Sequence, residues 1–107
     1  MGVAWMCLFV AGLFEIGWPI GLKMAQTPGR LIPGLVVSVV CMALSGLFLY
    51  LAQRSIPMGT AYAVWTGIGA AGAFSVGVLF YNDPLQLARL AGVGLIIAGV
   101  ATLKLAG

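Results

Sequence analysis

Apolar residues fill four long stretches of the chain, and short runs of polar residues and prolines separate them. The stretches extend from Val3 to Leu22, from Leu31 to Ala52, from Met58 to Phe80 and from Leu85 to Leu103. Each is close to the roughly 20 residues with which a helix crosses about 30 Å of hydrocarbon. The pattern therefore predicts an all-α integral membrane protein with four transmembrane helices.

The polar connections between these stretches are short, so successive helices are expected to run antiparallel. No segment is left over for a linker or an extramembrane module, and we expect residues 1–107 to form a single four-helix transmembrane domain. The first apolar stretch has no basic segment before it and is long enough to span the bilayer. These features favour a retained first helix over a cleaved signal peptide.

Composition supports a protein that faces lipid: 63% of the residues are apolar, 7% are charged, and the mean hydropathy is +1.17. Soluble domains carry about a quarter charged residues. The five cations are scattered singly and form no basic patch, so a nucleic-acid partner is not expected.

Without histidine, and with Cys7 and Cys41 inside apolar stretches, the sequence predicts no metal site, no disulfide framework and no cofactor. It also contains no enzyme motif.

The positions of lysine and arginine, which set the orientation of membrane proteins, are nearly balanced. Lys23, Arg30 and Arg89 fall on one side of the predicted membrane domain, and Arg54 and Lys104 fall on the other. The free N-terminal amine would remove the remaining difference. We therefore predict that the chain inserts in both orientations.

Glu15 is the only acid inside a predicted transmembrane stretch, and it lies near the middle of the first one. A carboxylate at that depth costs on the order of 3 kcal/mol and usually marks an ion or proton pathway. The alternative is a protonated side chain that only joins two helices by a hydrogen bond. A proton and a substrate cation would compete for this one carboxylate, and that competition suffices for antiport if only the occupied protein changes conformation.

Several side chains fall on the same helical face as their neighbours and could surround this acid. Gly12 would leave space beside Glu15, and the indole N–H of Trp18 could donate to the carboxylate. A second such stripe in the third stretch offers a phenol, an indole, a hydroxyl and a gap, from Tyr62, Trp65, Thr66 and Gly69. Aromatic faces attract cations, although these two rings could equally serve as helix contacts or interfacial anchors.

Small residues in the third stretch predict close helix packing through Gly69, Ala73 and Gly77, with a flexible hinge as the alternative. Glycines in the fourth stretch suggest contact with a second copy, since four helices alone leave little interior for a solute pathway. Ser45 is the main polar residue in the middle of the second stretch. Taken alone, it is expected to donate to a carbonyl of its own helix.

Two segments carry a resemblance to a known family: EIGW at residues 15–18 and, above all, GTAYAVWTGIGA at residues 59–70. With RLIP at residues 30–33, the chain resembles the small multidrug resistance family over essentially its whole length. The form of the twelve-residue segment, together with the tryptophan one turn after the acid, is similar to the guanidinium-exporter subtype.

This resemblance implies an antiparallel homodimer with dual topology in the bacterial plasma (inner) membrane. It implies the export of guanidinium or small substituted guanidinium cations in exchange for two protons. A single binding site would be shared by the two copies of Glu15, which would bind both substrate and protons.

Roles for further residues also follow from the resemblance. Trp18 and Ser45 would hold the central carboxylate through hydrogen bonds. Tyr62 and Trp65 would line the site, and Gly12 would give it room.

The chain departs from the family pattern at three places. Pro19 directly follows the site tryptophan and removes a backbone hydrogen bond, so we expect the first helix to bend there. Asp83 precedes the proline of the last loop, where a glutamate is more usual. The stretch from Pro33 to Ser45 is one residue longer than is typical, and the role assigned to Ser45 places the extra residue before it.

Three alternatives remain open. The first is an exporter of quaternary ammonium and other lipophilic cations, which lack the N–H groups that match a carboxylate in a two-pronged geometry. The second is a structural or proton-carrying proteolipid that transports no solute, although a rotor proteolipid needs only two helices. The third is one half of an obligate heterodimer, which the balanced positions of lysine and arginine disfavour.

Overall fold

The computed structural model describes residues 2–106, which form four α-helices and contain no strand. The helices are α1 (Gly2–Ala25), α2 (Leu31–Gln53), α3 (Met58–Phe80) and α4 (Leu87–Ala106). All four are long and apolar enough to cross a membrane, which confirms the predicted fold class. Residues 1 and 107, the ends of the predicted domain, lie outside the described residues.

The helix ends differ from the prediction by up to three residues, and α4 ends at Ala106 rather than at Leu103. Helix α1 continues past Leu22 to Ala25, and α4 begins at Leu87 rather than Leu85. The later start of α4 follows from a tight turn after α3, in which the backbone N–H groups of Tyr81 and Asp83 both donate to the carbonyl of Gly77. Asn82, between them, adopts a left-handed backbone conformation with φ of 57°. Asparagine tolerates this conformation better than most residues.

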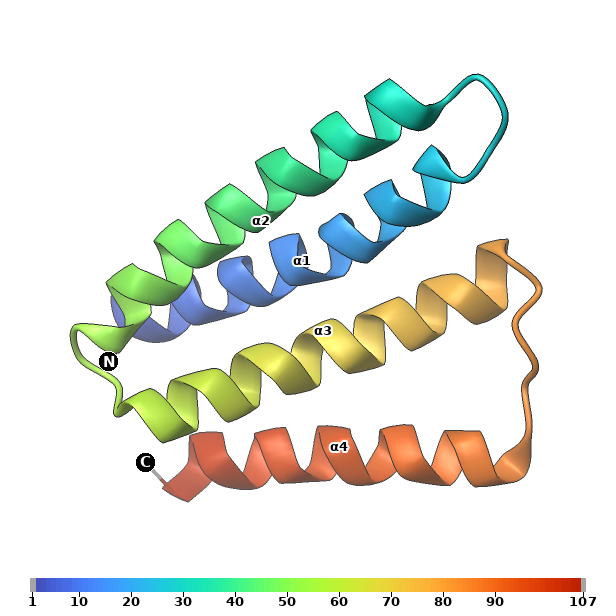
Figure 1. The fold of residues 1–107 in the computed structure, drawn as a ribbon. Helices are drawn as coiled ribbons and strands as arrows, with labels where there is room; N and C mark the ends of the chain where they lie inside the picture. The colour runs from blue at the N-terminus through green and yellow to red at the C-terminus, as the bar shows by residue number, and fades with distance from the viewer. Residues whose placement is uncertain (1, 107) are drawn as a thin grey trace.

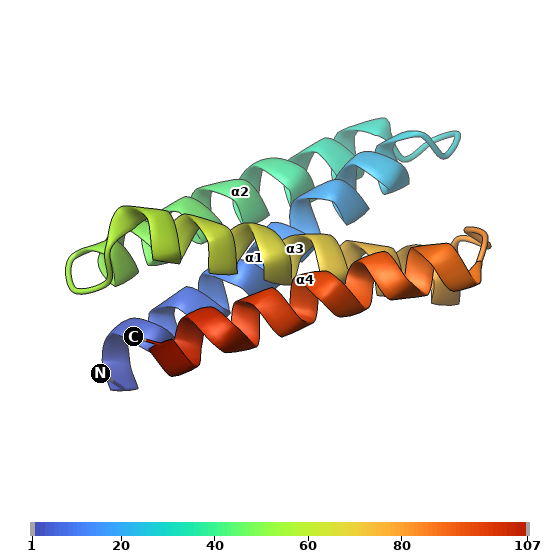
Figure 2. The same ribbon diagram turned by 90° about the horizontal axis from the view of Figure 1, so that it is seen from below.

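The helices form a thin slab in which α2, α1, α3 and α4 lie side by side in that order (Figure 1). Helix α1 contacts α2 and α3, and α3 also contacts α2. Helix α4 lies at the outer edge and packs mainly against α3, although the ammonium of Lys104 near its end lies over the ring of Trp5 in α1. The slab measures 45 × 34 × 17 Å, and Figure 2 shows α4 on the outside from a second direction. No residue of α4 is buried, so nearly all of this helix is available to lipid or to another protein chain.

Glycines allow α1 and α2 to approach closely near the turn that joins them. A Cβ atom on Gly34 would collide with the backbone of Ala25, and one on Gly21 would collide with Ser38. Ser38 is buried, and its hydroxyl donates to the carbonyl oxygen of Trp18 at 2.7 Å. Small residues thus bring the backbones together, as is common between membrane helices.

A compact apolar cluster holds the other end of the slab, where the N-terminal half of α1 meets the turn between α2 and α3. Its members are Trp5, Leu8, Ala52, Ile56, Ala61 and Val64.

Pro19 does not interrupt α1, which is helical from Gly2 to Ala25. The proline ring removes the N–H that would otherwise bond to the carbonyl of Glu15. The bend expected at this position stays a prediction.

The contact between α1 and α2 yields a test with a matched control in the same helix. Gly34→Ala is expected to destabilise the protein by about 1–3 kcal/mol, because the added methyl group forces two backbones apart. Gly46→Ala is expected to be neutral or slightly stabilising, since a Cβ atom there meets nothing within 4 Å. Titration of the purified proteins with a denaturing detergent measures both effects, and equal unfolding midpoints for the two variants would contradict this account of the packing.

Candidate functional site

Glu15 lies halfway along α1 and packs against Gly69 of α3. A Cβ atom on Gly69 would overlap the side chain of Glu15, so the glycine makes the room that the acid occupies. Gly69 was expected to pack helices together and to leave a gap on the stripe of Tyr62 and Trp65, but it was not among the residues predicted to line the site. Its spacing of four from Trp65 places it on the aromatic stripe, and that was the available signal for its place at the site.

The hydrogen bond expected between Trp18 and Glu15 is present. The indole Nε1 of Trp18 donates to Oε1 of Glu15 at 2.9 Å, and both side chains are half-buried. Within residues 2–106, no other hydrogen bond to this carboxylate is found. The carboxylate is therefore held in place by one donor while its remaining acceptor positions are free for a ligand.

Ser45 does not bond to the carboxylate, which corrects the role expected for it. Its fully buried hydroxyl donates to the carbonyl oxygen of Ala11 at 2.7 Å and accepts from Nε1 of Trp65 at 2.7 Å. The simpler expectation, a bond to a carbonyl of its own helix, is also wrong. The register of α2 against α1 places Ser45 beside Ala11, one helical turn before Glu15. Through these two hydrogen bonds Ser45 connects α1, α2 and α3 close to the acid.

The two predicted aromatic residues lie next to each other. The ring centroids of Tyr62 and Trp65 are 5.4 Å apart, with an interplanar angle of 47°. The indole of Trp65 points inward to Ser45, whereas Tyr62 is 56% exposed. Tyr62 lies in a groove of about 620 Å³ between α3 and α4. Of the two rings, only Trp65 is bonded into the helix contact beside Glu15.

Gly12 faces Ile68 of α3 rather than the acid. A Cβ atom on Gly12 would lie 2.7 Å from Cγ2 of Ile68, so the space that this glycine provides is filled by an isoleucine side chain. The expected room beside the acid is supplied by Gly69 instead, on the facing helix.

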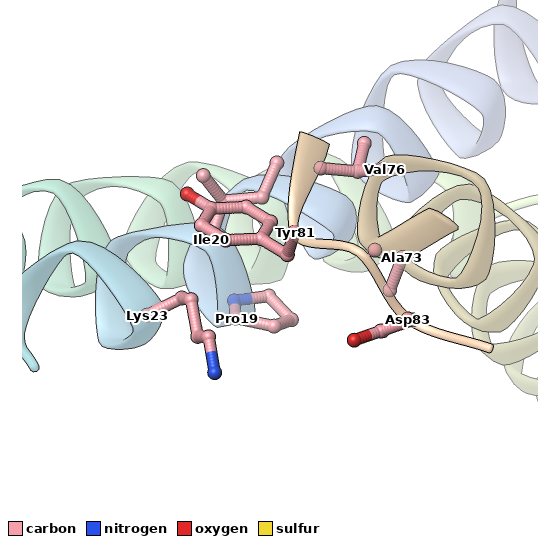
Figure 3. A pocket seen from close by; sticks show the side chains of 8 residues that line it. Pro19, Ile20, Lys23, Ala73, Val76, Tyr81 and Asp83 are labelled. Carbon is pink, nitrogen blue, oxygen red and sulfur yellow. The ribbon is translucent and has the colours of Figure 1, made fainter. Parts of the chain in front are cut away.

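A pocket of about 160 Å³ opens between the C-terminal halves of α1 and α3 (Figure 3). Pro19 follows Glu15 by one helical turn and Ala73 follows Gly69 by one turn, so the inner end of the pocket is about one turn from the acid along each helix. The residues that line it are Pro19, Ile20, Lys23, Ala73, Val76, Gly77, Tyr81 and Asp83.

The single carboxylate at this site is an acceptor that suits an organic cation or a proton. Among the residues that the structure describes, no three His, Cys, Asp or Glu side chains come together. The site consists of one carboxylate, one indole donor, and the gap left by a glycine.

Comparison with known proteins identifies the family of this chain. The sequence profile of the family described as Small Multidrug Resistance protein matches residues 3–96. The chain is 47% identical over 104 residues to the "Guanidinium exporter" of Yersinia pseudotuberculosis serotype I (strain IP32953), covering 97% of this chain and 99% of the relative. It is 46% identical over 103 residues to the "Guanidinium exporter" of Citrobacter freundii, covering 96% and 97%.

These relatives are transporters and not enzymes, and the four membrane-spanning helices make this chain a multi-pass membrane protein. The resemblance found in the segments at residues 15–18 and 59–70 is thereby confirmed. The chain belongs to the small multidrug resistance protein family.

Proposed function

We propose that the protein exports guanidinium or small substituted guanidinium cations in exchange for protons, with Glu15 as the group that binds both. One observation carries this proposal. The carboxylate of Glu15 lies in the middle of a membrane-spanning helix, fixed by Trp18 and otherwise without a hydrogen-bonding partner among the described residues. The names of relatives that match nearly the full chain support the choice of substrate.

The chemistry of guanidinium suits such a site. The ion is planar and weakly hydrated, and its N–H groups pair with a carboxylate in a two-pronged geometry. Because Trp18 occupies only one acceptor position of Glu15, the carboxylate can still accept N–H groups from the ion. A quaternary ammonium ion has no N–H to donate and would depend on aromatic and apolar contacts alone.

Coupling to protons follows from the position of the charge. An uncompensated carboxylate in hydrocarbon is costly, and either a proton or a substrate cation neutralises it. If only the neutralised protein changes its access from one side of the membrane to the other, each substrate that leaves must be replaced by protons. Competition for one group is then sufficient for exchange.

We further propose that two chains assemble as an antiparallel homodimer in the bacterial plasma (inner) membrane. Two features support this assembly: the exposed surface of α4 and the nearly equal numbers of lysines and arginines at the two ends of the helices. In such a dimer, two copies of Glu15 would share one site. Two carboxylates holding two protons or one cation would give the two-for-one exchange that the family resemblance implies.

Replacement of Glu15 tests the proposed function. In proteoliposomes with an imposed pH gradient, the parent protein is expected to take up labelled guanidinium, and Glu15→Gln to give only background uptake, because the amide can exchange neither a proton nor a cation. Ser75→Ala serves as a matched control, since Ser75 is exposed on α3 and bonds only to a carbonyl of its own helix. Uptake by Glu15→Gln at the parent rate would contradict the proposal.

A current with tetraalkylammonium ions but none with guanidinium would show a different substrate class.

The indole of Trp18 provides a second test. Trp18→Phe removes the one hydrogen bond that the carboxylate accepts from residues 2–106, which frees the acid to leave the geometry that receives the ion. A hydrogen bond to a charged group contributes about 1.5 kcal/mol or more, so KM for guanidinium is expected to rise roughly tenfold. Solid-supported membrane currents measure this change. Trp5→Phe, the same substitution in the apolar cluster, is expected to leave KM within about twofold, and an equal rise in both variants would argue against a local effect.

A further inference from the structure

Three polar side chains surround the mouth of the pocket between α1 and α3, and the mechanism above uses none of them (Figure 3). Lys23 lies in the last turn of α1, Tyr81 directly follows α3, and Asp83 lies in the loop that leads to α4. Figure 3 shows the ammonium of Lys23 and the carboxylate of Asp83 extending from opposite walls toward the same opening. A cation, an anion and an aromatic ring thus face one cavity.

Asp83 is fixed at this opening by its contacts with Gly77. Its N–H donates to the carbonyl of Gly77 at 3.0 Å, and its carboxylate packs so closely on Gly77 that a Cβ atom there would collide with it. The left-handed conformation of Asn82 completes the turn. The loop therefore places the acid over the pocket whether or not an ammonium group is nearby.

Lys23 lies over the ring of Tyr81, with Nζ 6.0 Å from the ring centroid. Ammonium groups at this distance are attracted to the face of an aromatic ring. A guanidinium ion stacks well on such a ring and is more weakly hydrated than an ammonium ion. The position that Lys23 holds is therefore one for which a guanidinium ion can compete.

The volume of the pocket fits a small organic ion. A water molecule takes up about 30 Å³ in the liquid, so about 160 Å³ has room for an ion of a few heavy atoms. The inner wall includes Pro19, one turn beyond the acid, a distance of about 5.4 Å along the helix. Lys23 at the mouth follows Glu15 by eight residues, which is about 12 Å along the helix.

We propose that this pocket is a peripheral cation site, in which guanidinium pairs with Asp83 and stacks on Tyr81 in place of the Lys23 ammonium before it reaches Glu15. The inference rests on the proposed function, because it names a stopping point for the same substrate. Lys23 acts here as a tethered competitor that any entering cation must displace.

A purely structural role makes a different prediction. If Asp83 only shaped the turn after α3 and Lys23 only extended its ammonium to the membrane surface, removal of either charge would change transport in the same direction or not at all. A capture site with a built-in competitor requires opposite effects. The sign of the change in KM therefore separates the two interpretations.

The test measures solid-supported membrane currents with guanidinium at low ionic strength for the parent, Asp83→Asn and Lys23→Gln. Asp83→Asn keeps the backbone bond to Gly77 and is expected to raise KM about two- to fivefold, and Lys23→Gln to lower it by a similar factor. These are the sizes expected for partly screened charges at an exposed mouth. Both shifts are expected to shrink at 1 M salt, where the screening length is about 3 Å.

Tyr81→Leu gives an independent reading, since it removes the ring and leaves both charges in place. It is expected to raise KM, so the proposal stays testable even if Asp83→Asn does not fold. The peripheral site would be overturned if KM moved in the same direction in Asp83→Asn and Lys23→Gln. It would also be overturned if KM in Tyr81→Leu equalled that of the parent.

The proposed function still stands in that case if the parent carries guanidinium current and Glu15→Gln does not. A parent with no guanidinium current would overturn both.

Discussion

The rest of the structure depends on one carboxylate placed halfway across a membrane-spanning helix. A charge in that position is costly, and the surroundings of Glu15 reduce its freedom without neutralising it. The indole of Trp18 holds one oxygen from the same helix, and Gly69 of the facing helix makes room for the side chain. The result is a fixed acid with free acceptor positions, which is what a site for an exchangeable cation requires.

Small residues and one buried network fix the helices around this acid. Gly34 brings α2 against α1, and the hydroxyl of Ser45 connects the carbonyl of Ala11 in α1 to the indole of Trp65 in α3. A buried hydroxyl with both a donor and an acceptor bond specifies one register of its helices, because any shift would leave polar groups unsatisfied. Packing and polar contacts thus fix α1 and α3, which form the site, together with α2 beside them. Helix α4, with no buried residue, remains at the edge of the slab.

The sequence was sufficient to predict the fold class and the position of Glu15 in the middle of a membrane-spanning helix. Four apolar stretches of membrane-spanning length predicted the helices, and the depth of Glu15 in the first stretch identified it without any partner. The bond from Trp18 could also be predicted, because it depends only on spacing within one helix. Contacts between helices were less accessible: Gly12 packs on Ile68, and Ser45 bonds to a backbone carbonyl rather than to the acid. These contacts depend on the register between helices, which hydrophobic patterns do not determine.

The central claim is that proton and cation compete for the carboxylate of Glu15, and direct measurement of proton release tests it most sharply. Guanidinium added to the purified, weakly buffered protein in detergent is expected to release protons in proportion to the ion bound, with no release from Glu15→Gln. Saturable guanidinium binding without proton release, over the range of pH in which the site is protonated, would contradict the account.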